Sequence, residues 1–322
     1  MVQRTTSVPR HEDPWAQLGD RPLPAPPFEA DVARRSSIIY TVVPGFRPLE
    51  LDLYTPADGD GSPRPAVMWI HGGAFALGTR QIAPAFLEEA DFFATLVRAG
   101  FVVASIDYRL SGEAQWPAQL LDVRTAVRWL RSRSAELAID PESIAVWGES
   151  AGAHLAAMAG VLGGTGRDEE PVSLELPRVA AVVDWYGPTD FRQMDVQAAE
   201  NSAMAHDDPE SPESRLVGAP VQEAGAIIDD ANPVTHVTAD APPFLIRHGE
   251  LDRLVAFGQS VLLAERLAEV GADVTLHAVP GAGHVFEGHP APGEFIAEAI
   301  EFLSRVLPTP PCHRADDLRG HP

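Results

Sequence analysis

The amino-acid sequence predicts an α/β fold, in which a mostly parallel sheet of eight strands carries helices on both faces. Short β-branched or apolar runs alternate with longer segments of helical periodicity, the pattern of a parallel sheet with crossover helices. Two of the runs, FVVASIDYRL (101–110) and SIAVWG (143–148), are apolar at nearly every position, as expected for strands that helices cover on both faces.

The first two expected strands differ from the others in how they are connected. SIIYTVV (37–43) and LELDLYT (49–55) are close together in the sequence and are expected to pair antiparallel. The other strands are expected at 66–72, 101–110, 143–148, 179–187, 243–249 and 274–281, and helices at 86–100, 117–137, 151–160, 258–271 and 292–307.

Three segments fall outside this alternation. Residues 1–35 are rich in proline and charge and are expected to form an N-terminal arm ahead of an α/β domain at 36–307. Residues 308–322 have the composition of a disordered tail. Residues 191–242 are acidic, show no strand pattern and lie between two core strands. We expect this insertion to form a small cap over the carboxyl ends of the strands, where ligands bind in open α/β sheets.

The composition excludes several classes of function. A net charge of −22 argues against a nucleic-acid or anionic-membrane partner, since both need clustered basic charge. The chain contains no lysine, which excludes a Schiff-base lysine and a P-loop. Its single cysteine, Cys312, leaves no intramolecular disulfide and no thiolate metal site. Because no signal-peptide core and no membrane span are recognisable, we expect a cytoplasmic protein.

A candidate nucleophile stands in VWGESAGAHL (146–155), where Ser150 follows a buried strand and precedes a helix of small residues. The pattern G-x-S-x-G is weak by itself, but on a strand–turn–helix it is typical of a nucleophile elbow. The helix N-terminus directs unpaired N–H groups toward the serine. The Ala151 N–H would therefore meet an oxyanion formed at Ser150.

The stretch WIHGGAFALG (69–78) supplies a candidate oxyanion loop. Gly72, Gly73 and Ala74 follow the end of a strand, and the glycines free the backbone to direct successive N–H groups into the site. We expect His71 to hold this loop by a hydrogen bond rather than to transfer protons.

The candidate base and the candidate acid are chosen by where they lie relative to the expected strands. His284 lies in the glycine-rich loop PGAGHVFEG after the last expected strand, and Asp252 lies three residues past the end of the strand before it. The order Ser150, Asp252, His284 agrees with a strand–turn–helix elbow and with neither other common order of a serine triad. Glu250 is the rival acid. His154 is expected behind the elbow, and His248 and His277 are expected to be structural. His206, His236 and His289 are expected in loops that face solvent.

From about residue 36 to residue 307 the sequence resembles the α/β-hydrolase carboxylesterases. The motifs that carry the resemblance are HGGAF (71–75), DYRL (107–110), WPAQLLDVRTAVRWL (116–130), IDPESIAVWGESAGAHLA (139–156), WYGPTD (185–190), PPFLIRHGELDRLV (242–255) and GAGHVF (281–286). The most similar subgroup includes bacterial feruloyl and acetyl-xylan esterases. The sequence differs from the family pattern at two positions: Ala74 replaces the third glycine of the lipase-type loop, and Ala256 is found where the family often has proline. Neither change removes a catalytic group.

We therefore expect a serine carboxylesterase that acts on small esters with a short or aromatic acyl part, needs no cofactor or metal, and is a monomer or a homodimer. The expected acyl pocket consists of aromatic residues near the mouth of the site: Phe75, Trp116, Trp185, Tyr186, Phe191 and Phe286. An arylformamidase-like amidase would use the same catalytic residues and stays an alternative. A non-catalytic binding protein on the same scaffold is disfavoured, because such proteins usually lack a triad member.

Overall fold

The computed structural model describes residues 28–29, 31–84, 86, 89–171 and 174–307. Within them one sheet has the strand order β1-β2-β3-β5-β4-β6-β7-β8-β9. The strands are β1 (Phe28–Glu29), β2 (Val32–Thr41), β3 (Leu49–Pro56), β4 (Arg64–Ile70), β5 (Val102–Ile106), β6 (Ile139–Glu149), β7 (Ala181–Trp185), β8 (Phe244–Gly249) and β9 (Val274–Val279). The pairs β1–β2, β2–β3 and β3–β5 are antiparallel and the others parallel, so the predicted fold class and the eight predicted strands are confirmed. The two-residue β1 is a ninth strand that was not predicted.

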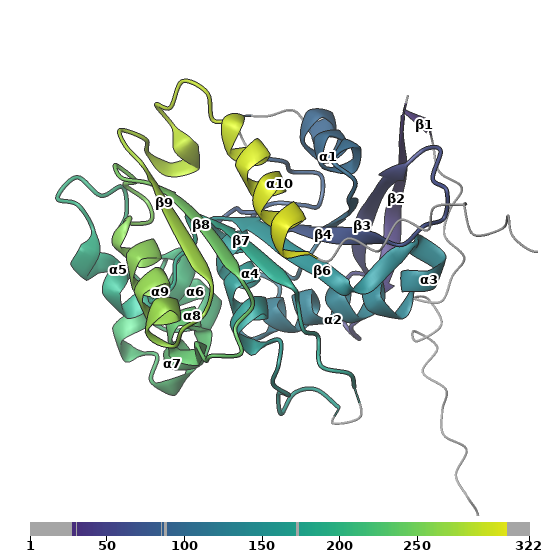
Figure 1. Ribbon diagram of the computed structural model, residues 1–322. Coiled ribbons are helices and arrows are strands. Elements are labelled where there is room, and N and C mark those ends of the chain that lie inside the picture. The colour runs from purple at the N-terminus through teal and green to yellow at the C-terminus, as the bar shows by residue number, and fades with distance from the viewer. Residues whose placement is uncertain (1–27, 30, 85, 87–88, 172–173, 308–322) are drawn as a thin grey trace, which may run out of the picture.

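Helices cover both faces of this sheet (Figure 1). On one face lie α1 (Glu89–Arg98) and α10 (Glu294–Val306), and on the other lie α2 (Ala118–Ser132), α4 (Ala151–Leu162) and α9 (Gly258–Glu269). A short α3 (Ser134–Leu137) follows α2. Alternate residues of β4 belong to different apolar clusters: Met68 packs with one and Trp69 with the other. A strand whose side chains are buried in both directions has to be apolar there, as β4 is over its buried part, residues 66–70.

The N-terminal arm predicted for 1–35 is wrong at its C-terminal end. Strand β2 begins at Val32 and pairs with β3, and β1 pairs with the start of β2. The polar stretch of β2 can join the sheet because the buried carboxylate of Asp52 on β3 accepts its hydrogen bonds. The donors are Arg34 Nη2 (2.8 Å) and the Ser37 backbone amide (2.8 Å). Residues 1–27 and the tail predicted for 308–322, with Cys312, lie outside the described residues.

The insertion at 191–242 is helical, and it contains no strand, as predicted. It consists of α5 (Phe191–Gln197), α6 (Pro212–Val217), the 3₁₀ turn η2 (Val221–Glu223), α7 (Ala226–Ala231) and α8 (Pro233–His236). Leu216, Val221 and Ile228 are buried and belong to the same apolar cluster as α2 and α4. The insertion therefore shares the core of the sheet rather than forming a separate one.

None of the helices in the described part of the chain combines the length and the apolar character that crossing a bilayer requires.

Candidate active site

Ser150 stands on a sharp turn between β6 and α4. Its backbone is in the left-handed region (φ 51°, ψ −121°), which is uncommon for a residue other than glycine. The turn requires close backbone packing: a Cβ at Gly152 would lie 2.0 Å from the Ile70 carbonyl oxygen. The Ser150 amide donates to the Trp185 carbonyl (2.8 Å), which ties the turn to β7. The local sequence thus holds the serine side chain away from the sheet.

The structure brings Ser150, His284 and Asp252 together. His284 Nε2 lies 3.1 Å from Ser150 Oγ, and His284 Nδ1 lies 2.6 Å from Asp252 Oδ2. Because an ionised carboxylate only accepts hydrogen bonds, Nδ1 carries the proton and Nε2 is free to accept the hydroxyl proton of the serine. Glu250, the rival acid, is exposed, and the partner of His284 Nδ1 is Asp252.

Asp252 accepts four hydrogen bonds. Its Oδ1 accepts from the amides of Leu254 (2.8 Å) and Val255 (2.9 Å), and its Oδ2 faces ring nitrogens of His284 and His248. Burial by itself would raise the pKa of Asp252, but the hydrogen bonds from the two histidines outweigh it and hold the pKa well below its usual range. The carboxylate is therefore ionised and oriented by groups from its own loop.

His248 is a functional neighbour that the sequence analysis missed. It was expected to be structural, yet its Nε2 lies 3.1 Å from Asp252 Oδ2 and 2.8 Å from the Val255 carbonyl oxygen. Since both neighbours are acceptors, Nε2 carries the proton, and Nδ1 accepts from the Ser260 hydroxyl at 2.7 Å. A signal was present in the sequence: His248 ends a strand four residues before Asp252.

Two of the four predicted oxyanion residues line the cavity that contains Ser150. These are Ala74 and Ala151. The backbone of Gly72 lies against the serine, since a Cβ there would be 3.4 Å from Ser150 Cβ. Gly73 turns the loop at φ 109°, where a Cβ would collide with the Leu77 carbonyl at 2.3 Å. In the described part of the chain, no acceptor is recorded for the amides of Gly73, Ala74 and Ala151.

Two buried histidines support the walls of the site. His71 Nδ1 lies 2.7 Å from the Gly72 carbonyl oxygen and its ring stacks on Tyr108, as expected for a residue that holds the loop. His154 lies behind the elbow, with Nδ1 2.9 Å from the Pro188 carbonyl oxygen. Burial lowers the pKa of each to about 4, so both rings are neutral at neutral pH and donate from Nδ1.

A buried acid lies beside the nucleophile. Glu149 Oε2 accepts a hydrogen bond from the Tyr186 hydroxyl (2.7 Å), and the Tyr186 ring meets the His284 ring edge-on at 4.8 Å. Burial raises the pKa of Glu149 to about 7, although the hydrogen bond from Tyr186 and the nearby His284 lower it. Tyr186 thus links the acid beside the serine to the ring of His284.

The cavity at Ser150 has a volume of about 70 Å³. Its lining residues are Ala74, Phe75, Ser150, Ala151, Pro188, Met204, His206, Pro212, Glu213, Leu254, Val255 and His284. Of the six aromatic residues predicted to form an acyl pocket, only Phe75 is among them. The other five do not line this cavity and are buried: Trp116, Trp185, Tyr186, Phe191 and Phe286.

These five aromatic rings are buried because they pack on one another and on histidines. Phe286 meets Trp185 at 5.4 Å and Tyr186 at 4.9 Å between ring centroids, and Phe191 stacks on His154 at 4.8 Å. The insertion supplies much of the cavity wall in their place.

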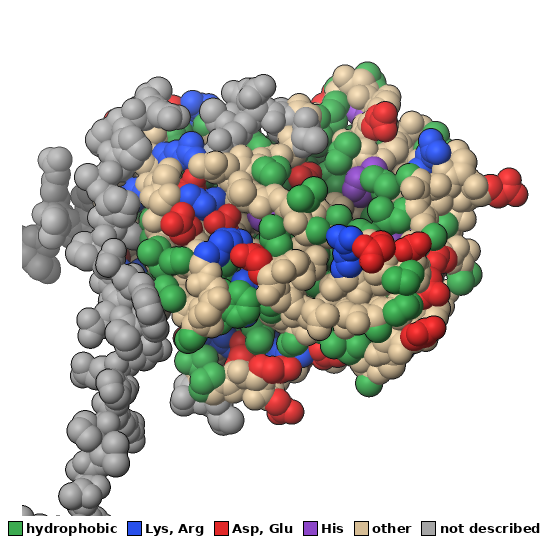
Figure 2. Space-filling view, turned by 180° about the vertical axis from the view of Figure 1, so that it is seen from behind, with side chains coloured by type: hydrophobic (Ala, Val, Ile, Leu, Met, Phe, Trp, Pro, Cys, Tyr) green, Lys and Arg blue, Asp and Glu red, His purple; other side chains and the backbone are tan. Residues whose placement is uncertain are grey.

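His206 was expected to face solvent and is instead 3% exposed. It lines the cavity together with Glu213, whose Oε2 lies 3.0 Å from His206 Nδ1. The outer surface of the insertion is acidic (Figure 2). The exposed carboxylates there belong to Asp195, Glu200, Asp208, Glu210, Glu223, Asp229 and Asp240. The insertion thus presents negative charge at the surface and a paired acid and imidazole in the cavity.

Comparisons with known proteins find one family model that matches the chain and several esterases that are similar to it. The BD-FAE family model matches residues 51–267. Esterase LipC of Mycobacterium tuberculosis is 34% identical to this chain over an alignment that covers 74% of this chain. The same alignment covers 57% of the length of LipC, so the chain spans only part of that relative. A truncated carbohydrate esterase from gut microbiota is 33% identical with a TM-score of 0.70, over 87% of this chain and 99% of that one. The esterase Est2 of Thermogutta terrifontis is 26% identical with a TM-score of 0.67, and the match covers 86% of this chain and 94% of the Est2 chain.

Proposed function

The chain belongs to the BD-FAE family, and on this premise we propose that it hydrolyses small carboxylic esters with Ser150 as the nucleophile. The observation that carries the proposal is the chain of hydrogen bonds from Ser150 Oγ through His284 to Asp252, at 3.1 and 2.6 Å. A serine on a strained turn, a neutral imidazole and an ionised acid in this order form the machinery of acyl transfer.

In the proposed reaction, Ser150 attacks the ester carbonyl while His284 Nε2 takes the hydroxyl proton. Asp252 holds the Nδ1–H tautomer and stabilises the imidazolium that forms. His284 then gives the proton to the departing alcohol, which leaves an acyl-enzyme. A water that His284 deprotonates attacks this intermediate, releases the acid and restores the serine.

The oxyanion of each tetrahedral intermediate would accept hydrogen bonds from the amides of Ala74 and Ala151. Both residues line the cavity beside Ser150. An amide without an intramolecular partner needs no reorganisation when charge develops, and one such donor lowers the barrier by about 3 kcal/mol. The Gly73 amide is the alternative donor from the same loop.

The size of the cavity supports a short acyl part. The cavity of about 70 Å³ is much smaller than the neighbouring groove of about 610 Å³ that Ala76, Ser111 and Arg215 help to line. We therefore favour the short-acyl substrates over the aromatic acyl substrates among those that the sequence left open.

A fluorophosphonate probe and an ester panel test the proposal. We expect the probe to label wild-type protein at Ser150 and to leave Ser150→Ala unlabelled. Among p-nitrophenyl esters, acetate and propionate should be cleaved faster than octanoate, and methyl ferulate should react slowly. Wild-type protein that neither forms the adduct nor cleaves any ester would refute the proposal. Faster cleavage of a matched anilide than of its ester would favour the amidase alternative.

A further inference from the structure

Two ionisable side chains of the insertion line the cavity at Ser150, and the mechanism uses neither of them. His206 lies between α5 and α6, and Glu213 lies in the first turn of α6. Their side chains are only 4% and 5% exposed. Burying two such groups beside a nucleophile is costly unless they are paired or meet a ligand.

The hydrogen bonds of His206 are all taken up inside the protein. Nδ1 faces Glu213 Oε2 at 3.0 Å, and the ring also bonds to the backbone of Leu254. Burial alone would lower the pKa of His206, but Glu213, Asp195 and the Leu254 backbone raise it above its ordinary value. A ring whose nitrogens both have partners inside the protein offers no donor to a substrate.

One carboxylate oxygen of Glu213 is available to accept a hydrogen bond from a ligand. Its Oε2 is paired with His206, whereas no hydrogen-bond partner for Oε1 is recorded among the described residues. The other polar side chains in the cavity wall, Ser150 and His284, are assigned to the reaction above, and the rest of the lining is apolar or alanine. The acceptor left for a substrate in this cavity is therefore a carboxylate oxygen.

From this arrangement we propose that Glu213 is a specificity-determining residue that accepts a hydrogen bond from a hydroxyl group close to the scissile ester. The inference rests on the proposed function and narrows it to hydroxylated esters. Because the cavity is small, the hydroxyl must lie within a few bonds of the ester carbonyl. The exposed carboxylates of the insertion disfavour the approach of substrates that carry a carboxylate.

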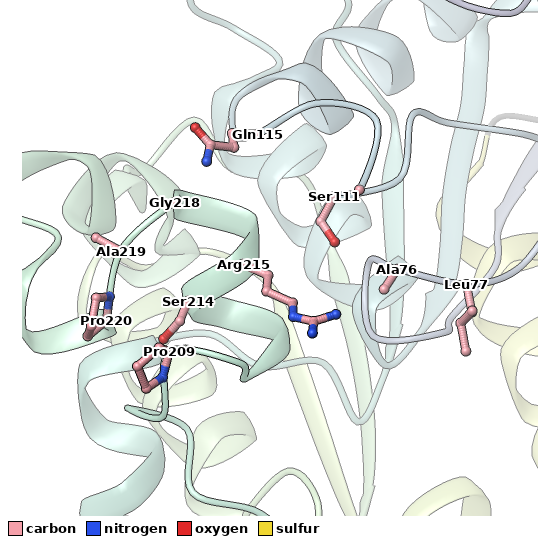
Figure 3. Close-up of a pocket in the computed structure, with 11 residues that line it drawn as sticks. Ala76, Leu77, Ser111, Gln115, Pro209, Ser214, Arg215, Gly218, Ala219 and Pro220 are labelled. Atoms are coloured by element: carbon pink, nitrogen blue, oxygen red, sulfur yellow. The ribbon is translucent and has the colours of Figure 1, made fainter.

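The hydroxyl can belong to the acyl part, as in a hydroxy acid ester, or to the alcohol part, as in a partly acylated polyol. A groove of about 610 Å³ lies beside the cavity and provides room for the larger part (Figure 3). Helix α6 contributes Glu213 to the cavity and Ser214 to the groove, and the oxyanion loop contributes Phe75 to the cavity and Ala76 to the groove. Ser111, Gln115 and Arg215 add polar groups to its wall.

Matched pairs of esters test the inference in a pH-stat. In the alcohol arm, 2-hydroxyethyl acetate is compared with ethyl acetate and with 2-methoxyethyl acetate, which has an ether oxygen but no donor. In the acyl arm, methyl 3-hydroxypropanoate is compared with methyl propanoate. A hydrogen bond to a charged group changes a rate constant by about tenfold to a hundredfold when it is formed in the transition state. The wild-type kcat/KM for the hydroxylated ester should therefore exceed that for the plain ester by at least about tenfold in one arm.

Variants assign this preference to the carboxylate. Glu213→Leu should reduce the ratio of kcat/KM between the hydroxylated and plain esters to about one, and Glu213→Gln should reduce it partly. Glu223→Gln removes the same charge from the exposed surface of the insertion and should leave the ratio unchanged. Equal wild-type kcat/KM within both arms overturns the inference, whether or not the variants fold, and so does a ratio that Glu213→Leu leaves intact. Failure to cleave ethyl acetate or any other ester would refute the proposed function as well.

Discussion

The buried acid beside the nucleophile makes protein stability depend on pH in a way that one substitution can isolate. Glu149 is 5% exposed and shares a hydrogen bond with the Tyr186 hydroxyl. Burial disfavours its charged form, so its pKa rises from 4.5 to about 7 in the folded protein. The amide of a glutamine accepts the same hydrogen bond and carries no charge at any pH. Glu149→Gln therefore removes the titration and keeps the contact.

The expected magnitude follows from this difference in pKa. Between pH 4.5 and about 7 the folded protein keeps the proton that the unfolded chain has lost. The stability contributed by Glu149 is therefore fully present below pH 4.5 and is lost as the pH rises to about 7. At 1.36 kcal/mol per pH unit, the loss amounts to about 3 kcal/mol. We expect the unfolding free energy of Glu149→Gln, relative to wild type, to rise by about this amount between pH 4.5 and pH 8.

Urea unfolding followed by tryptophan fluorescence measures this difference at several pH values. Two other buried groups, Asp184 with a pKa that burial raises to about 6 and His154 with a pKa that burial lowers to about 4, are present in both proteins and cancel in the comparison. Glu223→Gln at the exposed surface serves as the control and should show no pH-dependent difference from wild type. A difference between Glu149→Gln and wild type that stays constant from pH 5 to pH 8 would show that the acid is not desolvated as described.

Other substitutions test the remaining parts of the site. Ser150→Ala should lower ester hydrolysis to below about a thousandth of wild type with an unchanged circular dichroism spectrum, and higher residual activity would sink the nucleophile assignment. Asp252→Asn should lower kcat by about four orders of magnitude by presenting the wrong imidazole tautomer, whereas Glu250→Gln should leave kcat near wild type; the reverse result would move the acid to position 250. His248→Asn removes a donor to Asp252 and should lower kcat about tenfold with little change in KM, and a change in KM alone would contradict this positioning role. Deleting residues 191–242 exposes buried apolar surface and should abolish cooperative thermal unfolding, while a cooperatively folded deletion protein would show that the core does not need the insertion.

Much of the fold and the chemistry of the elbow could be predicted from the sequence because both depend on local patterns. A parallel strand buried on both faces must be apolar at nearly every position, and a strained turn packed against a helix needs small residues at fixed places. These requirements allowed the eight strands and the environment of Ser150 to be predicted. The position of Asp252 relative to Ser150 and His284 depends on the order of strands in the sheet, which the alternation of elements also implies.

Other features depend on which distant segments pack together. Strand β2 begins at Val32 because β3 offers it a partner and Asp52 accepts its polar groups. Five of the six aromatic rings that were predicted to line an acyl pocket are buried in the core, where they pack on one another and on histidines.

The histidines illustrate the same division between sequence and tertiary structure. An imidazole is tolerated in solvent, in a core or in a site, so residue type alone did not distinguish the roles of His206 and His248. Only packing decided them: the insertion places Glu213 against His206, and the loop after β8 folds Asp252 back onto His248. A hydrogen-bonding side chain takes its function from the partner that the fold supplies. Both partners are near in the sequence, with a separation of seven residues for His206 and Glu213 and four for His248 and Asp252, but the turn of the chain that brings each pair together and buries it depends on the tertiary structure.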